Sequence, residues 1–191
     1  VFCAIPLVFL IILLVAKLVN VPFWDSWEFV KILQKHDNGT LGFSDFFAQH
    51  NEHRILFPRI AMYVLALISN WDVRWESWFS VVLAVGTFIL LAKMLKRSLG
   101  NRYLLLAGSF LLSTIFFSPI QWENWLWGWQ IQWFMNVLAV VGAIYAAGFW
   151  RSSPTKKFLV AAVCGVVATY SLASGFFVWL VVLPLLFNDK S

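Results

Sequence analysis

The residues of this chain that could do chemistry concentrate between positions 20 and 59. Asp25 and Glu28 stand three positions apart, so a helix would place both carboxylates on one face. There they could act as a general base on an acceptor hydroxyl or as ligands of a metal ion. The same spacing fits a capping box, in which Asp25 begins a helix that ends at the Asn38-Gly39 pair. Both interpretations remain open.

A second polar cluster is the run His50-Asn51-Glu52-His53-Arg54, with Arg59 following it. On a helix, His50, His53 and Arg54 lie on one face, where they could hold a phosphate through charge-assisted hydrogen bonds. Two histidines and a carboxylate could also hold a divalent metal ion, although the spacing matches no established zinc pattern. The alternative is an interfacial loop whose arginines meet lipid headgroups.

A third cluster runs from Gln121 to Gln130 and sets one acid, Glu123, among several indole rings. Aromatic rings such as that of Trp122 suit the faces of sugar rings, while the Glu123 carboxylate and the Gln130 amide suit sugar hydroxyls. Tryptophans that only anchor a helix at the membrane interface explain the same residues.

The elements that must position these clusters are apolar helices. Of 191 residues, 61% are hydrophobic and 12% are charged, and the mean hydropathy is +0.80, whereas a soluble domain carries about a quarter charged residues. We therefore predict an all-α fold, a polytopic bundle of transmembrane helices. The expected spans are Phe2 to Val19, Trp75 to Leu95, Tyr103 to Ser118, Ile131 to Trp150 and Phe158 to Leu172. The apolar segment Phe176 to Phe187, which contains Pro184, either crosses again or begins a re-entrant turn.

The segment Ile55 to Ser69 is apolar but only about 22 Å long as a helix, which is short for a bilayer core. We predict that it lies along the interface, so that residues 20–74 form a long external loop carrying interfacial helices. The basic connections would then face the cytoplasm under the positive-inside rule. They contain Lys93, Lys96, Arg97 and Arg102 in one case and Arg151, Lys156 and Lys157 in the other.

Other features narrow the class of protein. The net charge of +5 comes from these short connections and does not indicate nucleic-acid binding. The sequence has no phosphate-binding glycine loop, no dinucleotide turn and no nucleophile elbow. We find no internal repeat and treat residues 1–191 as one membrane domain. Because the chain begins at Val1 and ends soon after an apolar run, we expect it to be part of a longer protein.

The arrangement resembles the GT-C superfamily of membrane glycosyltransferases, which includes protein mannosyltransferases and lipid A aminoarabinose transferases. The resemblance rests on three segments: the acidic run Phe23-Trp24-Asp25-Ser26-Trp27-Glu28 after the first span, the stretch His53 to Arg59, and a second span from Trp75 to Arg102. The acids here are three positions apart, whereas those of the family are adjacent. The resemblance implies an N-terminal part of a protein of the bacterial plasma membrane that moves a sugar from a polyprenyl-phosphate carrier to a lipid, glycan or protein acceptor at the external face.

The resemblance also implies roles for individual residues. Asp25 and Glu28 would be catalytic, and His53, Arg54 and Arg59 would contact the donor phosphate. Trp122, Glu123 and Gln130 would contact the sugar or the acceptor. The partners implied are membrane lipid and the polyprenyl-phosphate sugar, without nucleic acid, and a divalent metal ion is one option for a cofactor. The competing hypothesis is a non-catalytic membrane partner or a component of a lipid or polysaccharide transporter.

Overall fold

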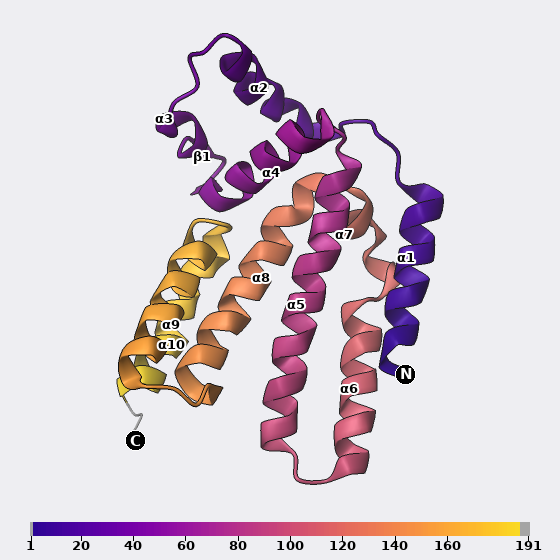
Figure 1. The fold of residues 1–191 in the computed structure, drawn as a ribbon, viewed down its shortest axis with the longest axis vertical. Helices are drawn as coiled ribbons and strands as arrows, with labels where there is room; N and C mark the ends of the chain where they lie inside the picture. The colour runs from indigo at the N-terminus through magenta and orange to yellow at the C-terminus, as the bar shows by residue number, and fades with distance from the viewer. Residues whose placement is uncertain (1, 188–191) are drawn as a thin grey trace.

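The computed structural model describes residues 2–187 and is almost entirely helical, as the composition predicts (Figure 1). The first helix is α1 (Ile5–Lys17), preceded by the short turn η1 (Phe2–Ala4). The long helices that follow are α5 (Arg74–Ser98), α6 (Arg102–Phe116), α8 (Ile131–Ile144), α9 (Pro154–Thr169) and α10 (Val178–Phe187). Short elements join them: η3 (Pro119–Gln121), α7 (Trp122–Leu126), η4 (Gly128–Gln130), the π-helical turn η5 (Tyr145–Phe149) and η6 (Ala173–Phe177).

Three helical stretches within residues 2–187 are long and apolar enough to cross a membrane: Arg74–Ser98, Arg102–Leu126 and Gly128–Phe149. They match three of the expected spans. The other two expected spans are shorter helices, of 13 residues in α1 and 16 residues in α9. α1 stops at Lys17 because the backbone becomes extended at Leu18. α9 begins at Pro154, so two lysines occupy its first turn.

The segment between α1 and α5 lies beyond one end of the long helices, and we call residues 20–70 the cap (Figure 1). Its elements are η2 (Trp24–Phe29), α2 (Val30–Asp37), α3 (Phe43–Phe46), the strands β1 (Gln49–His50) and β2 (His53–Arg54), and α4 (Leu56–Ser69). α4 coincides with the helix expected for Ile55 to Ser69. It lies across the ends of α5 and α8 and packs against both.

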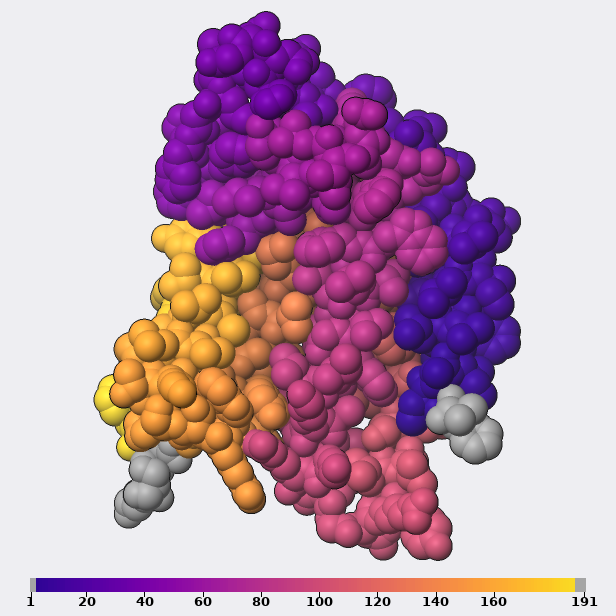
Figure 2. All heavy atoms as spheres, viewed as in Figure 1, coloured from indigo at the N-terminus to yellow at the C-terminus, as the bar shows by residue number. Residues whose placement is uncertain are grey.

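An apolar cluster joins the cap to the bundle. Phe29, Ile32 and Ile55 of the cap are buried against Leu83 of α5 and Ile131 at the start of α8. In the space-filling view the cap covers the adjoining ends of the long helices (Figure 2). Burying these side chains stabilises the junction, at about 1.5–3 kcal/mol for each large apolar side chain removed from water. The cap is therefore a packed layer that can hold polar side chains in fixed positions.

Within the bundle, α8 packs against α5 and α9. The contact between α8, α9 and α10 is rich in alanine, as expected where helices approach closely in an apolar medium. On the other side, Leu10 and Leu14 of α1 are buried against Val81 and Ala84 of α5. The small residues let the helices lie close together, and the long helices thereby form a support for the cap.

Candidate functional site

The 3-10 turn η2 places Asp25 and Glu28 on the same side of the chain. A 3-10 helix has 3.0 residues per turn, so side chains three positions apart lie directly above one another. The capping-box interpretation of Asp25 is wrong, because the residue before η2 is Phe23, which makes no side-chain cap bond, and α2 begins only at Val30. The predicted end of that helix is confirmed at Asn38, where Gly39 takes a φ of 66°.

Residues 49–54 form an antiparallel hairpin, so the helix that was one option for this segment is not formed. His50 pairs with His53 across the two strands, and Asn51 in the turn takes a left-handed φ of 49°. Asparagine tolerates this conformation better than most residues. In the hairpin Arg54 pairs with Gln49 and does not share a helix face with the two histidines.

His50 lies between the two carboxylates of η2. Its side chain is 4% exposed, and its Nδ1 lies 3.2 Å from Glu28 Oε2 while its Nε2 lies 3.8 Å from Asp25 Oδ2. The two carboxylates are more open, with side-chain exposures of 30% for Asp25 and 51% for Glu28. The contact between Nδ1 and Glu28 is within hydrogen-bond distance, whereas Nε2 lies 3.4 Å from Nδ2 of Asn51 and is too far from Asp25 for a direct hydrogen bond. The arrangement is therefore carboxylate, imidazole, carboxylate, with the acids facing outward.

Residues of the bundle hold the hairpin at this position. The His50 ring packs edge-on against Trp129 of η4, with 5.2 Å between ring centroids. His53 Nε2 lies 3.5 Å from Oε1 of Gln132, a buried residue in the first turn of α8. Asp25, His50 and Glu28 form a unit that we call the acid–histidine group. It packs against η4, directly before the first turn of α8. Trp129 belongs to the third cluster of the sequence, but its contact with His50 was not predicted, and Gln132 was not singled out, because only the fold brings these two residues to the hairpin.

A polar pocket of about 220 Å³ opens beside this group. It is lined by Glu28, Lys31, Lys35, Asp45, Arg59 and Trp129, among others. Lys35 forms an ion pair with Asp45, and the hydrogen bonds from Lys35 and from the Gly42 N–H lower the pKa of that carboxyl. Three cations against two carboxylates leave this pocket with a net positive charge.

Arg59 lies in the wall of the pocket and is 7% exposed. Its Nη1 donates to the carbonyl oxygens of Phe46, at 3.3 Å, and Ala48. Burial lowers the pKa of the guanidinium, and the nearby Glu28 charge opposes that shift. Arg59 therefore holds the chain of the cap in place and adds positive charge behind the pocket.

Arg54 lies apart from the other predicted phosphate contacts. Its Nη1 donates to the carbonyl oxygen of Phe47, and its guanidinium sits over the Phe47 ring at 4.7 Å from the centroid. The structure therefore groups Arg59 with Glu28, places His53 next to Gln132, and turns Arg54 toward Phe47. The reason is the hairpin, whose alternating strand geometry sends neighbouring side chains to opposite faces.

Trp122 and Glu123 line a second hollow, an apolar groove of about 300 Å³ between the end of α1, the start of α5 and α7. Phe23, which precedes η2, and Ser26 of η2 also line this groove, while Glu28 and Phe29 line the polar pocket. η2 is thus the wall between the two hollows. The indole N–H of Trp127 donates to the Phe23 carbonyl at 3.1 Å and holds that wall against η4.

Gln130 of η4 and Glu76 of α5 are buried polar residues. Gln130 is 8% exposed, and its Oε1 has no hydrogen-bond partner among residues 2–187. Glu76, in the first turn of α5, is 3% exposed and its Oε2 likewise lacks a partner within the described chain. Glu76 was missed in the sequence; the signal that could have found it is a carboxylate placed inside the start of a long apolar segment.

The described part of the chain brings few possible metal ligands together. Within residues 2–187 no group of three or more His, Cys, Asp or Glu side chains is arranged to hold a metal. The acid–histidine group can accept and donate protons, and the pocket next to it can attract an anion.

Comparison with protein-family models, with curated proteins and with solved structures finds no match for this chain.

Proposed function

We propose that this chain takes part in moving a sugar from a polyprenyl-phosphate carrier to a hydroxyl of a lipid, glycan or protein at the external face of a membrane. The single observation that carries the proposal is the Asp25–His50–Glu28 group, which stands beside a positively charged pocket at the end of an apolar helix bundle. Acids for proton transfer and cations for a leaving phosphate are what this reaction needs.

The proposal includes an orientation in which the chain crosses the membrane several times and the cap faces outside. The cap lies at one end of the long helices, and the basic turns 93–102 and 151–157 lie at the other (Figure 1). The orientation follows from the excess of lysine and arginine in the turns that face the cytoplasm. A bacterial plasma membrane is the setting that the resemblance to GT-C enzymes implies.

In the proposed step, the Asp25 carboxylate accepts the proton of the acceptor hydroxyl. The hydroxyl oxygen bonds to the anomeric carbon of the sugar, and the bond between that carbon and the phosphate oxygen breaks. The lipid phosphate leaves with the electron pair, and Lys31, Lys35 and the charge of Arg59 stabilise it. His50, held by Glu28, keeps the Asp25 carboxylate oriented.

The test is turnover by the chain reconstituted in lipid vesicles with a panel of polyprenyl-phosphate-linked sugars. Asp25→Asn keeps the side-chain shape but removes the base, so we expect turnover to fall by about 100-fold or more. The measured quantity is free polyprenyl phosphate released per unit time. Glu52→Gln is the matched control, since Glu52 is an exposed acid in the turn of the same hairpin. Equal turnover by wild type and Asp25→Asn would remove Asp25 from the mechanism.

The competing function, a non-catalytic partner or transporter component, is favoured by one observation. Asp25 faces His50, while Arg54 turns to Phe47, so these two charged groups do not converge on one substrate position. A wild-type chain that folds in vesicles but releases no polyprenyl phosphate from any donor supports this second function.

A further inference from the structure

The end of the bundle opposite the cap carries a hollow of its own. Its volume is about 580 Å³, and its wall contains Arg97, Phe149, Trp150, Arg151, Ser152 and Lys157. These residues come from three elements: the last turn of α5, the π-helical turn η5 with the loop after it, and the first turn of α9. Segments far apart in sequence therefore converge on one small region.

This hollow is positively charged, and none of the acids among residues 2–187 lies near it. Every Asp and Glu among residues 2–187 lies either in 25–76 or at Glu123, and α7, which contains Glu123, sits toward the cap (Figure 1). The elements packed around Arg97 and Arg151 are α5, η5, α9 and α10, and their described residues after Glu76 contain no carboxylate. The two guanidinium groups thus lack an acidic partner in the described part of the chain.

A contact with an aromatic ring holds Arg97 in place. The Arg97 guanidinium lies over the Tyr145 ring, 5.5 Å from its centroid, so η5 positions it. π-helical turns are rare and occur frequently at functional sites. α9 begins next to the hollow, and its N-cap residue, Ser153, makes no side-chain cap bond. The partial positive charge of this helix start adds to that of the arginines.

We propose that this hollow binds the phosphate headgroup of an anionic phospholipid from the membrane leaflet at that end. Arginine suits a phosphate because its planar fork can donate two hydrogen bonds to it, and basic pockets between membrane helices are known to hold such headgroups. A free phosphate would contact only the basic residues of the wall, whereas a lipid would also contact the aromatic ones. Phe149 and Trp150 line the hollow, and Phe158, which follows Lys157 on α9, is 55% exposed and available to the acyl chains.

The test uses native mass spectrometry of the full chain released from mixed micelles that contain phosphatidylglycerol and phosphatidylcholine. The pocket variant is Arg97→Gln with Arg151→Gln. The control variant, Lys96→Gln with Arg102→Gln, loses the same charge at the same end from residues outside the wall. Wild type and control should each retain one phosphatidylglycerol. We expect at least about a tenfold weaker affinity in the pocket variant than in the control, because two headgroup contacts are lost.

The possible outcomes distinguish a specific lipid-binding site from a general attraction between anionic lipid and surface charge. Equal loss of phosphatidylglycerol by both variants would show that surface charge alone draws the lipid, and it would overturn the proposal. A second arm adds excess inorganic phosphate: complete displacement of the lipid would mean that the hollow takes any phosphate, which also overturns the assignment to a lipid. Thermal unfolding of each variant confirms that it is folded, so a loss of lipid cannot come from a collapsed bundle.

Discussion

At the scale of single residues, His50 links the parts of the candidate site. A buried polar ring lowers stability unless its nitrogens have partners. Glu28 lies 3.2 Å from Nδ1 of His50, while Asn51 and Asp25 lie 3.4 and 3.8 Å from Nε2. The same pairing orders two carboxylates that stand more open to solvent. Replacing His50 would therefore change the positions of both acids, whereas replacing either acid leaves the ring in contact with the other acid and with Asn51.

A test at the scale of single residues can be made at Gly128, because η4 passes very close to α5 there. A Cβ at Gly128 would lie 2.5 Å from Glu76 Oε2 and 3.0 Å from the backbone oxygen of Val73. We expect Gly128→Ala to destabilise the chain by about 1–3 kcal/mol, as overpacking of a tight core does. The measurement is the thermal unfolding midpoint in detergent. Gly100→Ala is the control, since a Cβ at Gly100 meets nothing within 4 Å, and an equal midpoint for both variants would contradict the expectation.

The sequence predicts only the local part of the site. The spacing of Asp25 and Glu28 was enough to place them on one side of the chain, because three positions is about one turn in both α and 3-10 helices. The contact of His50 with Glu28 joins residues 22 positions apart. It depends on a hairpin whose turn needs a left-handed Asn51, and no helical pattern contains that information.

At the scale of elements, hydrophobic patterning predicts the long helices well and their ends less well. The cores of α5, α6 and α8 fall within the expected spans, and α4 matches the expected short helix. α1 is shorter than predicted, since apolar residues after Lys17 continue in extended backbone. Composition measures how apolar a segment is, while caps and tertiary contacts decide where a helix stops.

The turn between α9 and α10 depends on one glycine. A Cβ at Gly175 would lie 2.0 Å from the backbone oxygen of Ala168, which also accepts a hydrogen bond of 3.0 Å from the buried Asn136 Nδ2. Gly175→Ala must therefore push η6 away from the end of α9 and break that bond. We expect a lower unfolding midpoint and faster proteolysis between α9 and α10.

Gly148→Ala is the matched control for this element, because its Cβ would meet Leu185 of α10 at an ordinary 3.6 Å. It adds the same methyl group to a neighbouring part of the α8–α10 contact. If Gly175→Ala and Gly148→Ala have the same unfolding midpoint and the same rate of proteolysis, then the α9–α10 turn is not as tightly packed as these distances require.

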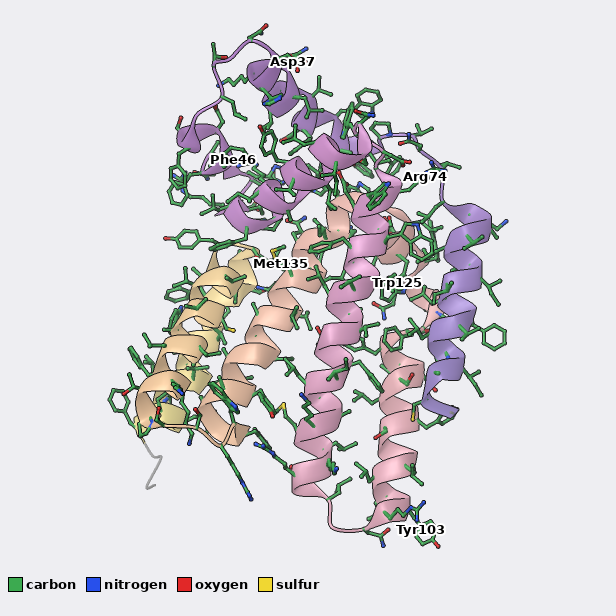
Figure 3. The ribbon with its side chains drawn as sticks, viewed as in Figure 1. Asp37, Phe46, Arg74, Tyr103, Trp125 and Met135 are labelled. Carbon is green, nitrogen blue, oxygen red and sulfur yellow. The ribbon has the colours of Figure 1, made fainter. Side chains whose placement is uncertain are left out.

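At the scale of the whole molecule, charge and aromatic residues are sorted along the helix axes. Among residues 2–187 the acids, the histidines and many indoles lie in or next to the cap, and Tyr103 and the basic turns lie at the far end (Figure 3). Asp37 and Tyr103, both labelled there, mark the two ends. α5 has 25 residues, which is about 37 Å of helix and enough to separate these ends by a bilayer core.

This separation predicts an alternating topology. In a chain with Cys3 and Cys164 replaced by alanine, single cysteines are placed at Thr40, Asn101, Ile120 and Ser153. Intact cells are then treated with a thiol reagent that cannot cross membranes. We expect labelling at Thr40 and Ile120, which lie toward the cap, and protection at Asn101 and Ser153. The reason is that Arg74–Ser98 lies between Thr40 and Asn101, α6 lies between Asn101 and Ile120, and Gly128–Phe149 lies between Ile120 and Ser153.

Permeabilised cells provide the control, since all four cysteines should react once the membrane is open. Each position is in an exposed part of the structure, and Ile120 is 87% exposed, so burial does not explain protection. Protection of both Thr40 and Asn101 in intact cells would mean that α5 does not cross alone and that α4 pairs with it as a second crossing. The acid–histidine group would then face the cytoplasm together with the basic turns, and the proposed transfer at the external face would be excluded.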